Sequence, residues 1–107
     1  MNTLRLKVDN SRANRRGLNL TVRRWAEKYQ PPLPRDLLLE DDSGRVAGAV
    51  IVGEKQMRFA DIPEGALVYE HDVCDRDKAG LLASMQRYYP GFEETDRVVL
   101  IWYWCGA

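Results

Sequence analysis

Apolar and polar residues alternate along two short stretches near the start of the chain. Residues 4–8 place leucine or valine at every second position, with arginine and lysine between them, and residues 18–22 repeat the alternation. A period of two is typical of a strand that buries one face. The pattern therefore predicts two strands, and it places Asn19, Thr21 and Arg23 together on one face of the second strand.

The residues between these strands predict a turn and a short helix. Residues 9–11, Asp-Asn-Ser, favour turns and helix caps. A short polar helical segment is expected over Ser11–Arg16, and Gly17 is a natural stop for it.

The middle of the chain indicates a helical turn followed by a hairpin. A helical turn is expected over residues 25–29, and Pro31 ends it. The leucines of residues 37–40 predict a strand, the Asp-Asp-Ser-Gly sequence at 41–44 a turn, and Val46–Val52 a second strand. The glycines in and after this second strand fit bends or bulges.

One clear helix is expected in the second half of the chain. Asp75 or Asp77 is expected to cap it, and the Pro-Gly pair at residues 90–91 ends it after Tyr89. The residues with helical spacing that form its apolar stripe are Leu81, Leu82, Met85 and Tyr89.

The final segment, Arg97–Trp104, is the most strongly strand-forming part of the chain. Trp102 and Trp104 should face one side of this strand and Tyr103 the other. We expect the two tryptophans to be core residues, with at least one of them deeply buried. A binding platform or a dimer contact is the alternative use of such an aromatic face.

Length and element order together predict the fold class. The chain has 107 residues, which suits one domain over 1–107 with a single hydrophobic core. Five or six expected strands and one helix favour an α+β, mostly β protein, built as a small barrel-like domain.

The composition points to a soluble cytoplasmic protein. The longest apolar runs are far shorter than the roughly 20 residues that span a membrane, and the N-terminal residues do not form a secretory signal. We therefore expect a cytoplasmic protein with no membrane partner.

A metal or other cofactor is not expected either. The two cysteines, Cys74 and Cys105, make no disulfide framework. With His71 they give three loosely spaced nitrogen and sulfur ligands, a poor set for zinc, so no metal site is predicted. His71 is interpreted as a surface residue, or as the acid or base of a ribonuclease-like reaction.

Charge is distributed unevenly although the formal net charge is zero. Residues 1–35 contain nine basic and two acidic residues, a formal charge of +7, and the rest contain seven basic and fourteen acidic residues, a charge of −7. A basic segment of this kind can mark a nucleic-acid face. Alternatively, the two segments interleave in the fold and neutralise each other.

Several motifs, in their order along the chain, resemble the ASCH domain, a branch of the PUA-like β-barrel folds. The landmarks are Gly17 to Arg23, the Phe-x-Asp-Ile sequence at 59–62, the stretch Ala66 to Glu70, the helix ending in Tyr-Pro at 89–90, and the apolar strand Val98 to Trp104. The resemblance covers nearly the whole chain and implies an ASCH-type barrel with one main helix.

The resemblance implies a function in RNA or nucleoside chemistry. Some ASCH proteins are hydrolases that use a lysine, a threonine and a glutamate to remove the acetyl group of acetylcytidine, and others look like ribonucleases or RNA-binding modules. Thr21, Arg23 and Glu70 match the family pattern. The lysine does not, because Asn19 stands in its place, and the segment Gly17 to Arg23 is one residue shorter than the usual motif.

The basic N-terminal part supplies the remaining candidate residues. Arginine binds phosphate with two parallel hydrogen bonds and stays charged at any working pH. We therefore expect Arg15, Arg16 and Arg24 to contact phosphates and Trp25 to stack on a base. A solvated basic face, with Trp25 covering the core, is the alternative.

The sequence thus predicts a protein that binds RNA or a modified nucleoside in a basic cleft. Thr21 and Arg23 are expected in the ligand pocket, and Glu70, with Thr21, would carry any catalysis. The alternatives are a hydrolase, either an acetylcytidine amidohydrolase or a ribonuclease, and a protein-interaction module that uses the terminal aromatic strand.

Overall fold

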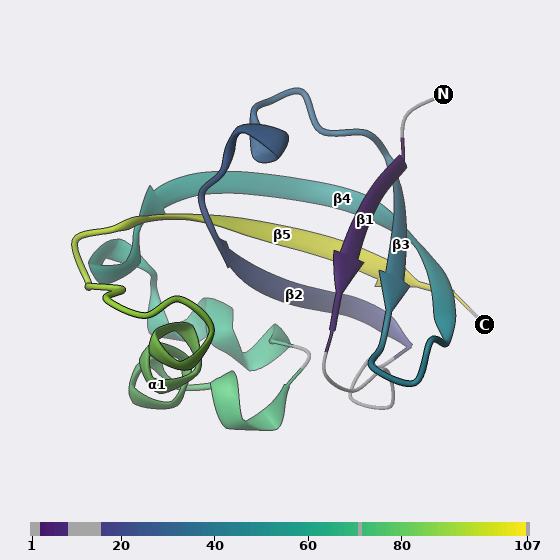
Figure 1. Cartoon of the computed structure of the whole chain (residues 1–107). Coiled ribbons are helices and arrows are strands. Elements are labelled where there is room, and N and C mark those ends of the chain that lie inside the picture. Colours follow the sequence, from purple (N-terminus) through teal and green to yellow (C-terminus); the bar gives the residue numbers. More distant parts are fainter. Residues whose placement is uncertain (1–2, 9–15, 71, 107) are drawn as a thin grey trace.

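Five strands and one main helix form the protein in the computed structural model, which describes residues 3–8, 16–70 and 72–106 (Figure 1). The strands are β1 (Thr3–Lys7), β2 (Gly17–Arg24), β3 (Asp36–Glu40), β4 (Val46–Arg58) and β5 (Arg97–Cys105). The helix is α1 (Lys78–Tyr88). The described residues also form four 3-10 turns: η2 (Glu27–Tyr29), η3 (Phe59–Asp61), η4 (Glu64–Tyr69) and η5 (Val73–Asp75). The prediction of a mostly β protein with one main helix is confirmed.

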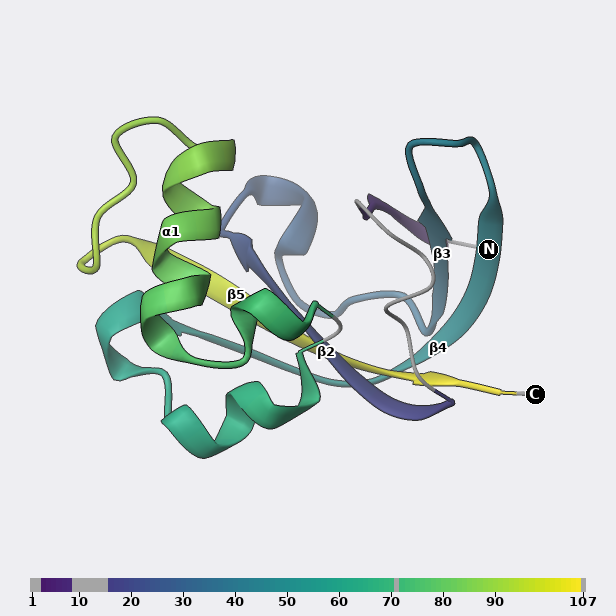
Figure 2. The same cartoon turned by 90° about the horizontal axis from the view of Figure 1, so that it is seen from below.

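The strands make a single mixed sheet in the order β1-β3-β4-β5-β2. β1 runs parallel to β3, and every other neighbouring pair is antiparallel. β1 and β2 occupy the two edges and do not pair with each other, so the sheet curls without closing (Figure 2). The predicted barrel is therefore wrong.

The segment before α1 explains why the barrel stays open. Closing a barrel requires the first and last strands of the sheet to pair along their lengths. Here the free edge of β2 pairs instead with the end of η4, through a parallel bridge between Leu20 and Glu70. A seam, defined as the gap between the edge strands β1 and β2, is left in the curled sheet.

Two hydrophobic clusters lie on the two faces of the sheet. One fills the concave space between the β1–β3 pair and the rest of the sheet; its strongly buried members include Leu6, Leu39, Ile101 and Tyr103. The other packs the opposite face against η3, η4 and α1; its members include Leu20, Phe59, Leu81 and Leu100. β5 serves both clusters, which is why its segment Val98–Ile101 is fully buried.

β4 continues six residues beyond the predicted end at Val52. Its second half is polar and mostly half-exposed, so it carries no apolar run that would mark it as a strand. The pairing with β5 holds it in place, with a register shift between Ile51 and Gly53 that fits the bulge expected of a glycine there.

α1 confirms the predicted helix and its cap. The Asp77 carboxylate accepts a hydrogen bond from the Gly80 amide at 2.7 Å, and Leu81 and Met85 of the apolar stripe are buried. Gly80 also allows a close approach, because a Cβ at this position would collide with the carbonyl oxygen of Cys74. The first turn of α1 is therefore packed directly against η5.

The aromatic end of β5 differs from the prediction. Trp104 is 51% exposed and Trp102 is half-buried, whereas Tyr103, which faces the other side, is fully buried. The expectation that one of the tryptophans is deeply buried is wrong. The reason is that η4 and α1 cover the tryptophan face of the sheet only as far as Trp102.

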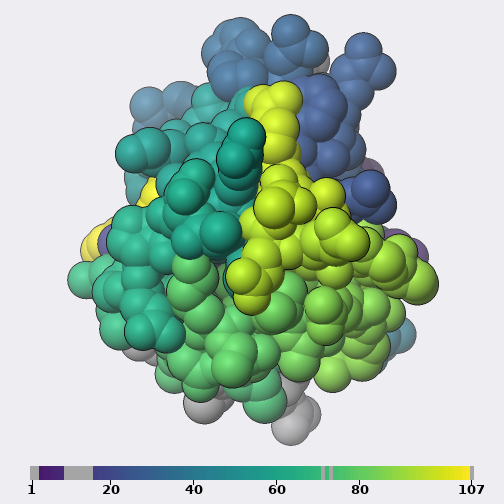
Figure 3. Space-filling model, turned by 90° about the vertical axis from the view of Figure 1, so that its left-hand side faces the viewer, coloured from purple at the N-terminus to yellow at the C-terminus, as the bar shows by residue number. Residues whose placement is uncertain are grey.

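The end of the sheet on which η4 and α1 pack is called the covered end. In the space-filling view of this end, α1 and the loop after it form a continuous surface with the end of β4 (Figure 3).

The helical segment predicted over Ser11–Arg16 falls, apart from Arg16, outside the described residues. Within the described part of the chain, no helix is long and apolar enough to cross a membrane.

Candidate functional site

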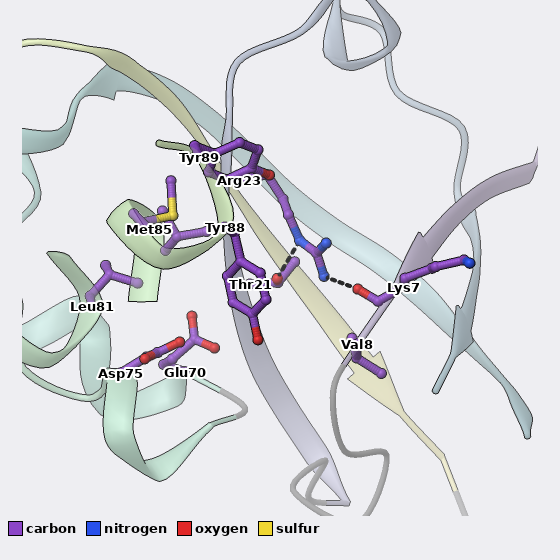
Figure 4. Close-up of a pocket in the computed structure, with 11 residues that line it drawn as sticks. Lys7, Val8, Thr21, Arg23, Glu70, Asp75, Leu81, Met85, Tyr88 and Tyr89 are labelled. Carbon is purple, nitrogen blue, oxygen red and sulfur yellow. Dashed lines mark hydrogen bonds between the residues drawn. The ribbon is translucent and has the colours of Figure 1, made fainter. Parts of the chain in front are cut away.

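A cavity of about 350 Å³ lies at the seam (Figure 4). One wall comes from the end of β1 and from β2, and the other comes from the end of η4, from η5 and from α1. Its lining residues are Lys7, Val8, Thr21, Val22, Arg23, Glu70, Asp75, Leu81, Met85, Tyr88 and Tyr89. The three residues that match the family pattern, Thr21, Arg23 and Glu70, therefore share one cavity.

Arg23 spans the seam above this cavity. Its Nε donates a hydrogen bond to Thr21 Oγ1 at 3.0 Å, and its Nη2 donates to the carbonyl oxygen of Lys7 at 2.8 Å. The first bond follows from the strand period, because residues 21 and 23 lie on the same face of β2. The guanidinium is thus held in one orientation, between the two edge strands of the sheet.

Glu70 lies on the free edge of β2, where the bridge to Leu20 fixes its backbone. Its carbonyl accepts from Arg76 Nε at 2.9 Å, and its Oε1 accepts from the Asp72 amide at 3.3 Å. The side chain is only 1% exposed. A buried carboxylate therefore lines the cavity next to Thr21.

Asp75 adds a second carboxylate from η5. It is buried, and its Oδ1 accepts a hydrogen bond from Ser84 Oγ at 2.5 Å. Asp75 and Glu70 both line the cavity, and Figure 4 shows both side chains at the end away from Arg23. From sequence this residue was expected only as one of two possible helix caps; Asp77 takes that role, and Asp75 is left to line the cavity.

The helix supplies an apolar and aromatic wall. Leu81 and Met85 are buried against the sheet, while Tyr88 is about half-exposed at the end of α1. The helical stripe indicated Leu81, Met85 and Tyr89 as inward-facing residues. It did not indicate Tyr88, which lies one position off the stripe and was missed.

A second hollow adjoins the cavity at Arg23 and Tyr89, which line both. Its other lining residues are Arg24, Trp25, Ala26, Lys28 and Tyr29. Two cations and two aromatic rings thus meet beside the cavity. Trp25 is half-buried, and the guanidinium of Arg97 lies over its ring at 5.0 Å from the centroid. One face of the indole is therefore already covered.

The arginines of the basic N-terminal segment do not form one cluster in space. Arg16 precedes β2 and Arg24 ends it, and at about 3.3 Å per residue they lie about 26 Å apart. Both are exposed. Only Arg24 lines the hollow next to the cavity. Arg15 falls outside the described residues, so its predicted role stays a prediction.

Burial perturbs three titratable groups near the site. It raises the pKa of Tyr29 to about 12, an effect that Arg23 partly offsets. It also raises the pKa of Tyr103, with smaller contributions from Cys105 and Glu70, and that of the Cys105 thiol. Both phenols accordingly stay neutral at physiological pH and act as packing and hydrogen-bonding groups, not as bases.

The described residues contain no group of three histidine, cysteine, aspartate or glutamate side chains that could hold a metal ion. Cys74 is exposed, Cys105 is half-buried, and both are free thiols. His71 falls outside the described residues.

Comparison with known proteins gives no match: no family model, no curated protein and no solved structure matches this chain.

Proposed function

We propose that the protein binds single-stranded RNA or a modified nucleoside at the seam cavity and the hollow beside it. One observation carries the proposal: Thr21, Arg23 and Glu70 line a single cavity, and Arg24, Trp25 and Lys28 line the hollow that adjoins it. A cavity of a few hundred Å³ with an apolar wall and a few convergent polar groups is typical of a small-ligand site.

The two spaces differ in the chemistry they offer. The hollow presents the cations of Arg24 and Lys28, which suit a phosphate, and the ring of Trp25 beside them. The cavity is more enclosed by protein and ends at two carboxylates, which suit a nucleobase. A nucleotide with its base in the cavity and its phosphate in the hollow would use both, with Arg23 between them. The ASCH resemblance supports the same interpretation and remains part of the proposal.

A hydrolase is the second candidate, and the buried carboxylates of Glu70 and Asp75 are the observation in its favour. Amide hydrolysis also needs a group that stabilises the developing oxyanion. The ammonium of Lys7 points away from the cavity (Figure 4). Position 19, where the family has its lysine, carries a fully buried asparagine that donates to the Gly17 carbonyl. We therefore expect slow or undetectable release of acetate from acetylcytidine.

The proposal is tested by fluorescence anisotropy with a labelled, mixed-sequence RNA hexanucleotide. Phosphate contacts release counterions, so the affinity should fall steeply between 50 and 200 mM salt. Replacing both Arg24 and Lys28 by alanine should remove most of the binding. Arg45→Ala is the matched control, because Arg45 is an exposed arginine in the hairpin away from the hollow. Equal affinity of the double variant and the wild type would contradict the assignment.

A turnover assay separates the two candidates. Product release from acetylcytidine is followed over time for the wild type and for Glu70→Gln. Turnover that is brisk in the wild type and lost in the variant would establish the hydrolase in place of the binding protein.

A further inference from the structure

We propose that Arg58 and Arg97, which lie opposite each other where β4 ends and β5 begins, bind a further phosphate of a single-stranded RNA. The inference rests on the proposed function, because it takes RNA as the ligand and the hollow as the first phosphate site. It goes further in favouring an RNA strand over a free nucleoside, since a ligand with one phosphate or none cannot occupy both positions. The strand would run from the hollow across the end of the sheet.

Arg58 and Arg97 form a pair of like charges across two strands. They are register partners at one end of the antiparallel β4–β5 ladder, so both side chains project from the same face, with Cβ atoms about 4.5–5.5 Å apart. Both are exposed, and no acidic side chain in the described part of the chain forms an ion pair with either. Asp96, the acid next to Arg97 in sequence, accepts a hydrogen bond from the Glu93 amide at 2.9 Å instead. Like charges directly opposite each other destabilise a sheet, and an anion held between them removes the repulsion.

Contacts with two neighbours hold the Arg97 guanidinium in one orientation. Its Nη2 donates to Gln56 Oε1 at 2.6 Å, and the group lies over the Trp25 ring at 5.0 Å from the centroid. Arginine has five N–H donors in a planar fork that matches the oxygens of a phosphate. One hydrogen bond leaves most of these donors available. Because its side chain is already ordered, Arg97 loses little conformational freedom when it binds an anion.

The arginine pair continues the hollow. Trp25 lines the hollow, and its amide donates to the Arg97 carbonyl at 3.0 Å, so Trp25, Arg97 and Arg58 form one row across the end of the sheet. Figure 3 looks onto this end and shows the segment after β2 in blue, the start of β5 in yellow-green and the end of β4 in teal next to one another. With about 4.8 Å between strands, the backbone of Arg58 lies about 10 Å from that of Trp25. Sites for single-stranded RNA combine cations along the backbone with aromatic rings, and this row contains both.

The test compares an RNA strand with single nucleotides. Binding of a labelled, mixed-sequence RNA hexanucleotide is measured by anisotropy at low salt, and an equimolar mixture of the ribonucleoside 5′-monophosphates is used to displace it. Arg58→Ala should weaken hexanucleotide binding on the order of fivefold and reduce the slope of log affinity against log salt by about one, because a phosphate contact is lost. The inhibition constant of the monophosphates should stay unchanged, since they occupy only the cavity and the hollow. Arg45→Ala, the control in the hairpin, should change neither quantity.

A second measurement tests the repulsion between the two arginines. Arg58→Glu places opposite charges across the strands, which stabilises a sheet. It should raise the thermal midpoint of the free protein at low salt and weaken hexanucleotide binding more than Arg58→Ala does. This combination distinguishes a phosphate ligand from a residue that only supports the fold, whose replacement would lower the midpoint. A midpoint below that of the wild type would contradict the unrelieved repulsion on which the proposal depends.

The possible failures are distinguishable. Equal affinity of the wild type and Arg58→Ala for the hexanucleotide would overturn the second phosphate site and leave the hollow standing. The absence of hexanucleotide binding by the wild type at low salt would overturn both proposals. Equal weakening of the hexanucleotide and the monophosphates in Arg58→Ala would show that Arg58 acts on the hollow and not on a phosphate of its own.

Discussion

The two ends of the β2–β5 pair are built from similar residues and covered differently. At the covered end, where η4 and α1 pack on the sheet, Leu100 and Ile101 are fully buried on opposite faces. At the open end, Tyr103 is fully buried on one face while Trp104 is 51% exposed on the other. Alternating apolar residues therefore identify a strand, but only the cover placed on each face decides what is core.

The arginines of β2 and of the residue before it also differ between the two ends. Arg23 and Arg24 end β2 beside the cavity and the hollow, whereas Arg16 lies at the open end. The candidate site lies where the layers meet and leave an enclosed space, not where arginines are densest in sequence.

The largest effect is expected from truncating a core residue at the covered end. Leu100→Ala should lower the free energy of unfolding by about 2–5 kcal/mol, because it leaves a cavity between the sheet and the helix layer. Trp104→Ala, at the open end, should cost about 1 kcal/mol or less despite removing a larger side chain. Urea denaturation measures both. A loss for Trp104→Ala as large as that for Leu100→Ala would show that the open face is covered in solution.

Replacing a glycine by alanine should also affect stability differently at the two ends. Gly80→Ala forces the first turn of α1 away from the Cys74 carbonyl and should cost about 1–3 kcal/mol. It should also weaken RNA binding, since Asp75 follows directly after Cys74. Gly48→Ala is the matched change in an exposed part of β4, where a Cβ meets no atom within 4 Å. Thermal melts should show a lower midpoint for the first variant and an unchanged or higher one for the second.

The buried phenol at position 103 gives a prediction about pH. Its pKa is raised in the folded protein above the ordinary value of 10.0, so the unfolded chain loses this proton first as the pH rises. The free energy of unfolding should therefore fall above pH 10, by up to about 1.4 kcal/mol per pH unit for one phenol. Denaturation at pH 9 and pH 11 should show a smaller fall for Tyr103→Phe than for the wild type. Identical pH dependence would contradict this account.

The smallest effect concerns the two arginines at the ends of β2. Arg24→Ala should reduce the slope of log affinity against log salt by about one, as expected when one phosphate contact is lost. Arg16→Ala should leave the slope unchanged, because Arg16 lies at the far end of β2 from the hollow. Equal changes in the two variants would place the RNA along the whole strand.

The sequence predicted the local features of this molecule better than the contacts between distant segments. The period of two placed Thr21 and Arg23 on one face of β2, and helical spacing placed Leu81 and Met85 on the buried stripe of α1. The cap was narrowed to Asp75 or Asp77, and the structure has Asp77. The open seam did not follow, because nothing in a strand pattern says whether Leu20 pairs with another strand or with Glu70. The full burial of Tyr103 did not follow either, because a strand pattern does not say which face of the strand is covered.

The candidate site was predictable to the extent that neighbouring residues on one strand form it. Glu70 was expected there only through the family resemblance, and Asp75 only as a possible cap. Tyr88 lies off the apolar stripe and gave no signal. These three positions depend on how η4, η5 and α1 return to the edge of β2, which is a property of the whole chain and not of any single segment.

The hydrogen bond from Arg23 to the Lys7 carbonyl couples the site to the mechanics of the sheet. An anion that attracts the guanidinium competes with that carbonyl, so occupancy of the site and attachment of β1 to β2 are linked quantities. The coupling is reciprocal: the factor by which a bound ligand changes the equilibrium for detaching β1 equals the factor by which detaching β1 changes the ligand affinity. β1 borders the candidate site only at its last residue, Lys7, which Val8 follows. We therefore expect the amide protons of β1 to exchange with solvent at a rate that depends on whether the candidate site is occupied.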